Sequence, residues 1–406
     1  MRLPVSFIAL MISVAFLQLS SGGLSPLDAL SGLQVGFSST QIGLLGSAHF
    51  VGFFVGCWWS PRLMGTVGHA RAFATFAACG AIGAIAHPLW IDAWFWAGLR
   101  IMTGLCVAGC YTIIEAWLHA SVDNATRGRA LGSYRLVDLS MSMLAQLLIG
   151  VLPAASYVSY NLLAILCCAS LFPLMVSRAR QPESPEAPRL RPLKAFRLSP
   201  LGVAGVVVAG LTTGSFRMVG PVYGQQVGLD AGQTGLFLAA FVFGGALAQI
   251  PVGWLADKFD RRWVLIWLSL AALLACAMTV LFGTVNTALV FALAAFFGLV
   301  TFPIFSVASA HANDFAGADF MIELSASLMF WYGIGAIASP LIASSLIENY
   351  GPSALFVFIS LAHIVLATIG LARMLARPTA TTRTPYRYLP RTSFTLGRLF
   401  KRRGGH

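Results

Sequence analysis

The sequence predicts an all-α membrane protein with twelve transmembrane helices in two six-helix bundles that are related by a pseudo-two-fold repeat. Three observations predict this fold class: the composition, the spacing of the apolar segments and the placement of the positive charges. Apolar residues make up 58% of the chain and charged residues only 10%, and the mean hydropathy is +0.80. Because one soluble core cannot bury so much apolar surface, we expect lipid to be the solvent.

Apolar segments long enough to cross a bilayer recur along the whole chain. A helix needs roughly 20 apolar residues to span the hydrocarbon. The first six expected spans cover residues 3–25, 40–60, 72–90, 93–118, 130–152 and 158–177. The second six cover residues 199–221, 233–255, 263–283, 288–311, 320–347 and 353–375.

Lysine and arginine collect at alternate connections between the spans. Arg62 and Arg71 follow the second span, and Lys258 follows the eighth. The intervening turns carry neither residue type, around Asp28, Asp92, Ala155, Asp230, Asn286 and Glu348. Because positive residues stay on the cytoplasmic side, we expect both termini in the cytoplasm of a multi-pass protein of the bacterial inner membrane.

The net charge of +12 fits this topology and an attraction to anionic lipid, and dispersed cations argue against nucleic acid as a partner. All seven cysteines fall inside expected spans, without the spacing of a ligand cluster. We therefore expect neither disulfides nor a metal, and no cofactor.

An internal repeat appears when the chain is shifted on itself by 192 residues. Residues 35–52, VGFSSTQIGLLGSAHFVG, then align with residues 227–244, VGLDAGQTGLFLAAFVFG. Identical pairs include Gly36 with Gly228, Gln41 with Gln233 and Gly52 with Gly244. The repeat predicts two parallel halves, and it keeps the first apolar segment as a true span.

The repeat and the polar segments predict four regions. They are a first bundle at 1–177, a cytoplasmic linker rich in proline and charge at 178–198, a second bundle at 199–375 and a basic cytoplasmic tail at 376–406. We expect the tail to lie on anionic lipid or to lack fixed structure.

The connection after the eighth span carries the most specific motif. Its sequence GWLADKFDRR at 253–262 resembles the loop signature G-x-L-a-D-[RK]-x-G-R-[RK] of the major facilitator superfamily, with Asp260 in place of a usual glycine. The corresponding connection in the first half, after the second span, lacks the aspartate that Asp257 supplies here. The resemblance implies a cytoplasmic gate formed by Gly253, Asp257, Lys258, Arg261 and Arg262.

The fourth span adds two further similarities. Arg100 and Gly104 match the superfamily motif R-x-x-x-G, whose buried arginine is implicated in proton coupling. The run YTIIEAWL at 111–118 looks like the YcaD-like subfamily of these transporters. The antiporter motif G-x-x-x-G-P is missing from the fifth span, which makes drug export less favoured.

Ionisable residues inside a bilayer are costly, so each one suggests a functional role. One face of the fourth span carries a stripe that we expect to face the transport pathway: Arg100, Gly104, Ala108, Tyr111 and Glu115. Alternatively, backbone carbonyls satisfy Arg100 and loop cations pair with Glu115.

The fifth span carries Arg135 and Asp138 at a spacing that allows them to neutralise each other. Together with Glu115 they predict a network that either exchanges a proton or clamps two helices statically. His49 lies near the middle of the second span, where a proton-exchanging role competes with a structural one.

Further polar residues could line a cavity or bridge helices. Arg217 would attract anions at an outer gate or extend to lipid headgroups. The candidates for the cavity are Gln18, Tyr111, Gln146, Arg217, Gln249 and Tyr332.

These features predict a secondary active transporter of a small organic solute, proton-coupled and working by alternating access. Asp138 or Glu115 would gain and lose the proton while Arg100 and Arg135 alternate between that acid and the substrate. A facilitative uniporter and a transport-inactive receptor or scaffold are the alternatives, and an enzyme is not expected. The partners expected are a small, possibly anionic substrate, protons and lipid, for a monomeric protein.

Overall fold

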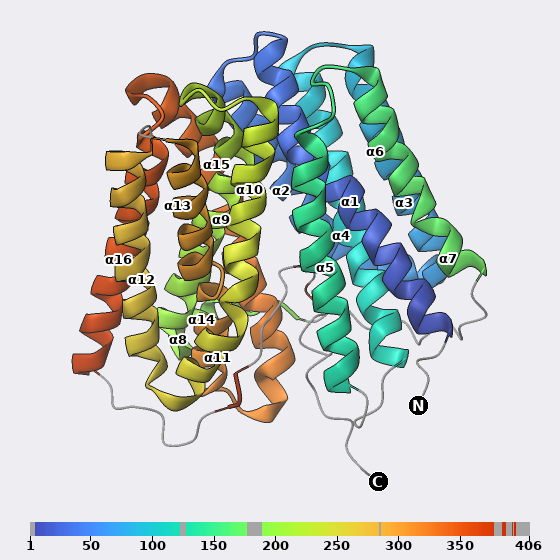
Figure 1. Ribbon diagram of the computed structural model, residues 1–406. Coiled ribbons are helices and arrows are strands. Elements are labelled where there is room, and N and C mark those ends of the chain that lie inside the picture. Colours follow the sequence, from blue (N-terminus) through green and yellow to red (C-terminus); the bar gives the residue numbers. More distant parts are fainter. Residues whose placement is uncertain are drawn as a thin grey trace.

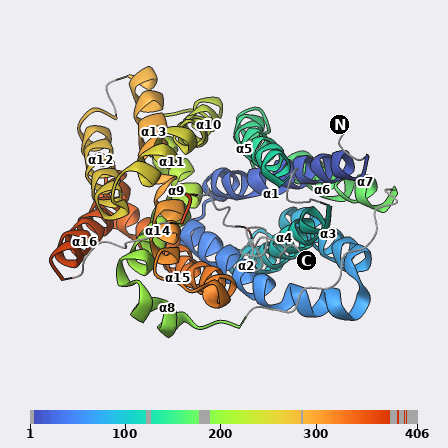
Figure 2. The same cartoon turned by 90° about the horizontal axis from the view of Figure 1, so that it is seen from below.

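The computed structural model describes residues 5–121, 127–176, 189–283, 286–376, 384–386, 392 and 394. Within these residues the backbone forms sixteen α-helices and no strand. Figure 1 shows two groups of long helices standing side by side, and Figure 2 separates the same groups in a view along the helices. Eleven helical segments are long and apolar enough to cross a membrane, which confirms the predicted class of fold.

The first group, called the first half below, precedes the connecting segment. It consists of α1 (Val5–Gln34), α2 (Ser39–Val67), α3 (His69–Ala86), η1 (His87–Leu89), α4 (Ala93–Ser121), α5 (Arg127–Ile149), α6 (Tyr157–Ala169) and α7 (Leu171–Val176). A short helix, α8 (Pro192–Leu198), follows in the connecting segment and packs against α15 of the other group.

The second group is called the second half. It consists of α9 (Pro200–Gln226), α10 (Ala231–Leu247), α11 (Gln249–Lys258), α12 (Arg261–Phe282), α13 (Thr287–Thr301), α14 (Ile304–Asn313), η2 (Ala318–Phe320), α15 (Met321–Tyr350) and α16 (Ala354–Ala376). Two of its predicted spans are broken helices. α11 contains Pro251, and Pro303 precedes α14, and a proline removes a backbone donor from the helical ladder.

The fifth predicted span does not reach the apolarity of the other eleven. It corresponds to α5, which carries Arg127, Arg129, Arg135 and Asp138. α5 nevertheless packs along α1 and α10, where the two groups of helices meet. Asp138 is tolerated because its side of the helix lines the cavity described below rather than lipid.

The internal repeat is visible in the helix starts. Ser38 caps α2 and exchanges hydrogen bonds with Gln41, and Asp230 caps α10 and does the same with Gln233. Asp230 follows Ser38 by 192 residues, and Gln233 follows Gln41 by the same offset. The same capping box therefore begins the second helix of each half.

Glycine allows two helices in each half to approach closely. A Cβ added at Gly52 of α2 would overlap the carbonyl oxygen of Ile101 in α4, and one at Gly244 of α10 would overlap that of Ala295 in α13. The reciprocal contacts use Gly104 and Gly298. Small residues permit such backbone contact in lipid, where no hydrophobic effect drives helices together.

The two ends of the molecule differ in charge. We call the end where α2 finishes and α9 begins the basic face, since Arg62, Lys194 and Lys258 lie there, and the other end the opposite face. At the opposite face the two halves touch. The backbone N–H of Thr40 donates to Glu348 Oε2 at 2.7 Å, and Gly43 of α2 packs on α15.

We predict that Gly52→Ala destabilises the protein by about 1–3 kcal/mol, because the methyl group forces α2 away from α4. Thermal unfolding of the purified protein in detergent measures this. Gly98→Ala is the matched control, since a Cβ at Gly98 of α4 meets open space. Equal melting temperatures for the two variants would contradict the role assigned to the contact.

Candidate functional site

A cavity of about 130 Å³ lies between the two halves, which gives room for roughly four water molecules. Helices α1, α2, α4 and α5 line it from the first half. From the second half it is lined by α9, α10 and α15, and by Phe302 at the end of α13. The repeat thus contributes corresponding helices to both walls.

The polar lining comes mostly from the first half. The Tyr111 hydroxyl donates to Gln18 Oε1, and it lies 3.4 Å from Asp138 Oδ1. Gln146 donates to the carbonyl of Gly22 at 3.1 Å. One wall therefore offers a carboxylate and neutral hydrogen-bonding groups.

The positive charge in the cavity comes from the second half. Arg217 on α9 is exposed to the cavity, and none of the ion pairs among the described residues includes it. His49 on α2 lines the same space and packs edge-to-face on Phe50, with ring centroids 5.4 Å apart. Arg217 and Asp138 thus reach one small volume from opposite halves.

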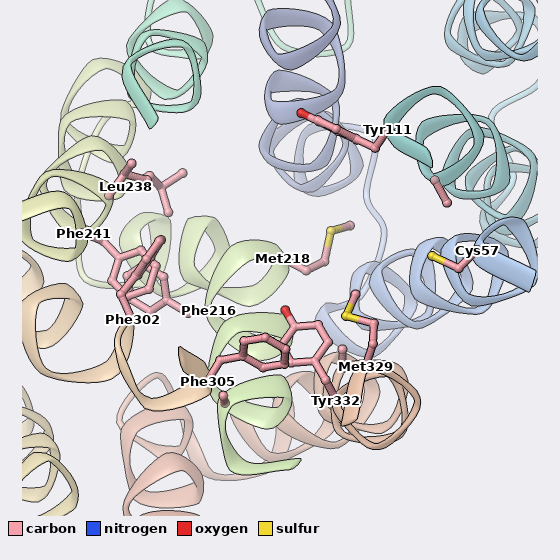
Figure 3. Close-up of a cluster of buried hydrophobic side chains, with 14 of the residues drawn as sticks. Cys57, Tyr111, Phe216, Met218, Leu238, Phe241, Phe302, Phe305, Met329 and Tyr332 are labelled. Carbon is pink, nitrogen blue, oxygen red and sulfur yellow. The ribbon is translucent and has the colours of Figure 1, made fainter. Parts of the chain in front are cut away.

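Aromatic side chains cover the rest of the second-half wall. The ring centroids of Phe216 and Phe241 are 4.2 Å apart. Those of Phe241 and Phe302 are 5.1 Å apart. Figure 3 shows these three rings gathered on one side of the space, with Tyr111 reaching from the other side. Such a wall suits an apolar or planar group.

The structure differs from the expectation that the Arg100 stripe faces the pathway. Arg100 is 1% exposed, does not line the cavity, and pairs with Asp28 Oδ2 at 3.4 Å and with Ser25 Oγ at 2.6 Å. Asp28 was expected in a turn, but α1 continues past it to Gln34. Of the stripe, only Tyr111 lines the cavity.

Two further side chains complete the group around Asp28. Tyr160 donates to Asp28 Oδ1 at 3.0 Å, and His87 Nε2 lies 3.5 Å from Asp28 Oδ2. The rings of His87 and Tyr160 stack at 5.1 Å. Asp28 was missed because only the folded chain brings it beside Arg100, and its polarity makes α1 look shorter than it is.

The three residues of the predicted network differ in whether they line the cavity. Asp138 lines the cavity, whereas Arg135 lies beside the ring of Tyr134, 5.5 Å from its centroid. Glu115 is buried outside the cavity lining, where it accepts a hydrogen bond from Thr392. A shared proton-exchanging role for the three residues stays a prediction.

Of the remaining cavity candidates, one lines the cavity and one does not. Tyr332 lines the cavity, but Gln249 donates to the carbonyl of Gly245 in the preceding turn, at 2.6 Å, and is absent from the lining. The residues that the structure brings together in the cavity are Gln18, His49, Tyr111, Asp138, Gln146, Arg217 and Tyr332.

The motif after α11 forms a compact charge cluster at the basic face. Arg261 is buried and pairs with Asp257 at 3.4 Å and with Asp314 at 2.6 Å. It also donates to the Ala310 carbonyl at 2.9 Å. Arg261 thus joins the ends of α11, α12 and α14. Asp314 was missed, because nothing in the motif points to the end of α14.

The other gate residues have local contacts. Asp260 pairs with Arg262 at 2.7 Å and caps α12, so the acid that replaces the usual glycine has a structural use. The ammonium of Lys258 lies over the ring of Trp254, 4.6 Å from its centroid. Glu323 pairs with the linker residue Arg191 at 3.1 Å.

In the parts of the chain that the structure describes, no three histidine, cysteine or acidic side chains are grouped as metal ligands. A family model described as the Major Facilitator Superfamily matches residues 7–230 and again residues 202–404. The chain belongs to this superfamily. It is therefore a multi-pass membrane transporter and not an enzyme, and its partners include a small-molecule substrate and the bilayer.

Curated relatives agree. An uncharacterized MFS-type transporter of Yersinia pestis (strain Pestoides F) is 27% identical over 85% of this chain and 88% of its own. The uncharacterized MFS-type transporter YcaD of Escherichia fergusonii is 26% identical over 84% of this chain and 89% of its own. The resemblance to YcaD-like transporters is confirmed.

Solved structures share the fold. The nucleoside transporter NupG has a TM-score of 0.75 at 14% identity, covering 91% of this chain and 99% of its own. A bacterial homologue of the human lysosomal transporter Spinster, inward-facing and unoccupied, has a TM-score of 0.72 at 14% identity, covering 92% and 96%. At these identities the similarity concerns the fold alone.

We predict that Asp28→Asn destabilises the protein by about 3–5 kcal/mol, because Arg100 is left buried without its carboxylate. Thermal unfolding measures the change. Asp92→Asn is the control, since Asp92 only caps α4 and asparagine caps equally well. The double variant Asp28→Asn, Arg100→Gln should recover part of the loss, and no recovery would contradict the pairing.

Proposed function

We propose that this transporter is a proton-coupled secondary active carrier of a small organic solute, working by alternating access. The observation that supports the proposal is one cavity shared by both halves, in which Asp138 of the first half faces a space that Arg217 enters from the second half. A solute bound there contacts both halves, so its binding favours an arrangement of one half relative to the other.

Asp138 is the group that we propose to carry the proton. It lines the cavity within reach of the Tyr111 hydroxyl and is therefore accessible to the same solvent as the substrate. Glu115 and Arg100, two of the other coupling candidates, lie outside the cavity lining. Of the two acids expected to exchange the proton, Asp138 and Glu115, we therefore propose Asp138.

We propose that the basic face is cytoplasmic, in the inner membrane of a bacterium, with both termini on that side. Arg62, Lys194 and Lys258 at this face support the orientation, because lysine and arginine are retained on the cytoplasmic side. In this orientation the halves are in contact at the outer end, through Thr40 and Glu348. We propose a monomer, since the cavity is formed within one chain.

The proposal predicts that purified protein in proteoliposomes accumulates at least one member of a panel of radiolabelled carboxylates, neutral polar solutes and amines when a proton gradient is imposed. Asp138→Asn should abolish accumulation above the external concentration but leave exchange of that solute across the membrane. The carboxylate is required only for coupling, whereas exchange needs only the cavity and the motion of the halves.

Asp319→Asn is the matched control, because Asp319 is exposed and does not line the cavity. It should accumulate the solute as the unmodified protein does. If Asp138→Asn retains gradient-driven accumulation, the role of Asp138 is wrong. If the unmodified protein only equilibrates the solute, it is a uniporter.

A further inference from the structure

We infer that the substrate is a small organic monoanion with a planar apolar body, whose carboxylate is held by Arg217. This inference rests on the proposed transport function and names the substrate class of the same cavity. Arg217 is the cation that lines the cavity, and its planar guanidinium matches a carboxylate with two parallel hydrogen bonds.

The charges elsewhere in the protein make Arg217 distinctive. Arg100 is neutralised by Asp28, and Arg261 by Asp257 and Asp314. Among the described residues no ion pair satisfies Arg217, although it lies in a cavity within the membrane-spanning helices. A cation in that position is stabilised by an anionic ligand.

The shape of the lining defines the rest of the ligand. Phe216, next to Arg217 on α9, packs on Phe241, which packs edge-to-face on Phe302, and the three rings form an apolar wall of the cavity that Arg217 also lines. A cavity of about 130 Å³ limits the ligand to a small molecule. Gln18 and Gln146 across the cavity accept smaller polar substituents.

Asp138 links this anion to the proton. When Asp138 is ionised, the cavity holds one acidic and one basic charge, and protonation leaves the charge of Arg217 alone. An anion therefore binds more tightly to the protonated form, and binding of the anion favours protonation in return. A monoanion and a proton would be carried together, without net charge.

Several charged or titratable groups surround Asp138. α1 and α10, which pack against α5, carry Asp28, which is paired with Arg100, and Asp230, which caps α10. The groups near the carboxylate are Tyr111 and Glu115 on α4, His49 on α2, Arg135 on α5 and Arg217 on α9. Of these, Tyr111, His49 and Arg217 line the cavity with it.

Three probes with one body and different charge test the inference: phenylacetate, phenylacetamide and 2-phenylethylammonium. Isothermal titration calorimetry on the purified full chain measures binding without any gradient. We expect phenylacetate to bind at least about tenfold more tightly than the other two. Arg217→Gln should lose that preference and Arg217→Lys should retain part of it, whereas Arg62→Gln, at the basic face, should bind as the unmodified protein does.

The proton link has its own readout. Phenylacetate affinity should rise as the pH falls from about 8 to about 6, where the ligand stays ionised. In the Asp138→Asn variant the affinity for phenylacetate should be high and independent of pH. Equal affinity for phenylacetamide, or unchanged phenylacetate binding in Arg217→Gln, overturns the inference. If phenylacetate binds as expected but no solute accumulates, the proposed function fails while the binding site stands.

A second inference rests on different contacts, those of the C-terminal segment at the basic face. The backbone N–H of Thr384 donates to Asp314 Oδ1 at 2.8 Å, and Arg261 donates to the Thr384 carbonyl. The N–H of Tyr386 donates to Asp257 Oδ1 at 2.7 Å, with its ring against Gly253. The residues expected to form the gate in the second half are therefore bound by the chain itself.

Further along, the same segment contacts the first half. Thr392 donates to Glu115, and its carbonyl accepts a contact from Cys57 Sγ at 4.0 Å. Phe394 is 3% exposed and packs edge-to-face on Phe54, with ring centroids 5.5 Å apart. Thr392 also lines the central cavity. These described residues differ from the expectation that the tail lies on lipid or lacks fixed structure.

The geometry points to an autoinhibitory plug: Thr392 narrows the cavity on the side of the basic face, residues 384–386 anchor the segment to the second half, and Thr392 and Phe394 anchor it to the first. The test uses Cys57, which is 1% exposed beneath Thr392. N-ethylmaleimide labelling of the folded protein, followed by mass spectrometry, measures its accessibility.

Phe394→Ala, and separately a chain that ends at Ala376, should label at Cys57 several-fold faster than the unmodified protein. Cys276, buried in α12, is the internal control and should label at an unchanged rate. Faster labelling at Cys276 would reveal unfolding of the shortened chain. In that case the labelling rate of Cys57 in Phe394→Ala is the test of the plug. An unchanged rate at Cys57 in Phe394→Ala, with Cys276 protected, overturns the plug.

Discussion

The close contact of α2 with α4, repeated as α10 with α13, is the constraint on which the rest of the structure depends. Each contact brings a glycine of one helix onto a backbone carbonyl of the other, at Gly52 and Gly104 in the first half and at Gly244 and Gly298 in the second. Contacts of this kind leave little room for adjustment inside a half. Motion is therefore directed to the interface between the halves, which is where the cavity lies.

The placement of charge follows the same division. Charges inside a half are paired, Arg100 with Asp28 and Arg261 with Asp314, because an isolated ion in low dielectric is costly. Charges that line the cavity are accessible to solvent and to ligand, and there Arg217 and Asp138 belong to different halves. The pairs stabilise the two bodies, and the charges that face the cavity are available for exchange with substrate and proton.

Much of the fold could be predicted from the sequence because its signals are local or repeated. Apolar length identifies the spans, and the offset of 192 residues aligns Gly52 with Gly244, which make equivalent helix contacts. Tyr111 and Arg217, expected in the cavity, and Asp138, expected as a coupling residue, line one space. Periodicity places such residues on one side of a helix, and a polar side inside a bilayer needs a polar environment.

What could not be predicted depends on contacts between distant segments. Arg100 was assigned to the pathway because its partner Asp28 lies on another helix, and the polarity around Asp28 hid the true length of α1. The C-terminal residues Thr392 and Phe394 gave no signal, since their burial is created entirely by the helices around them. Composition alone describes that segment as basic and polar.

The central claim is that two rigid halves move about a shared cavity, and distances between the halves test it most directly. Spin labels at Thr66 and Lys258 report on the basic face, and labels at Val151 and Tyr350 on the opposite face, in a cysteine-free background in nanodiscs. When phenylacetate and acid are added, double electron–electron resonance should show the first distance shortening as the second lengthens. Two distances that stay fixed, or that change in the same direction, would contradict the account.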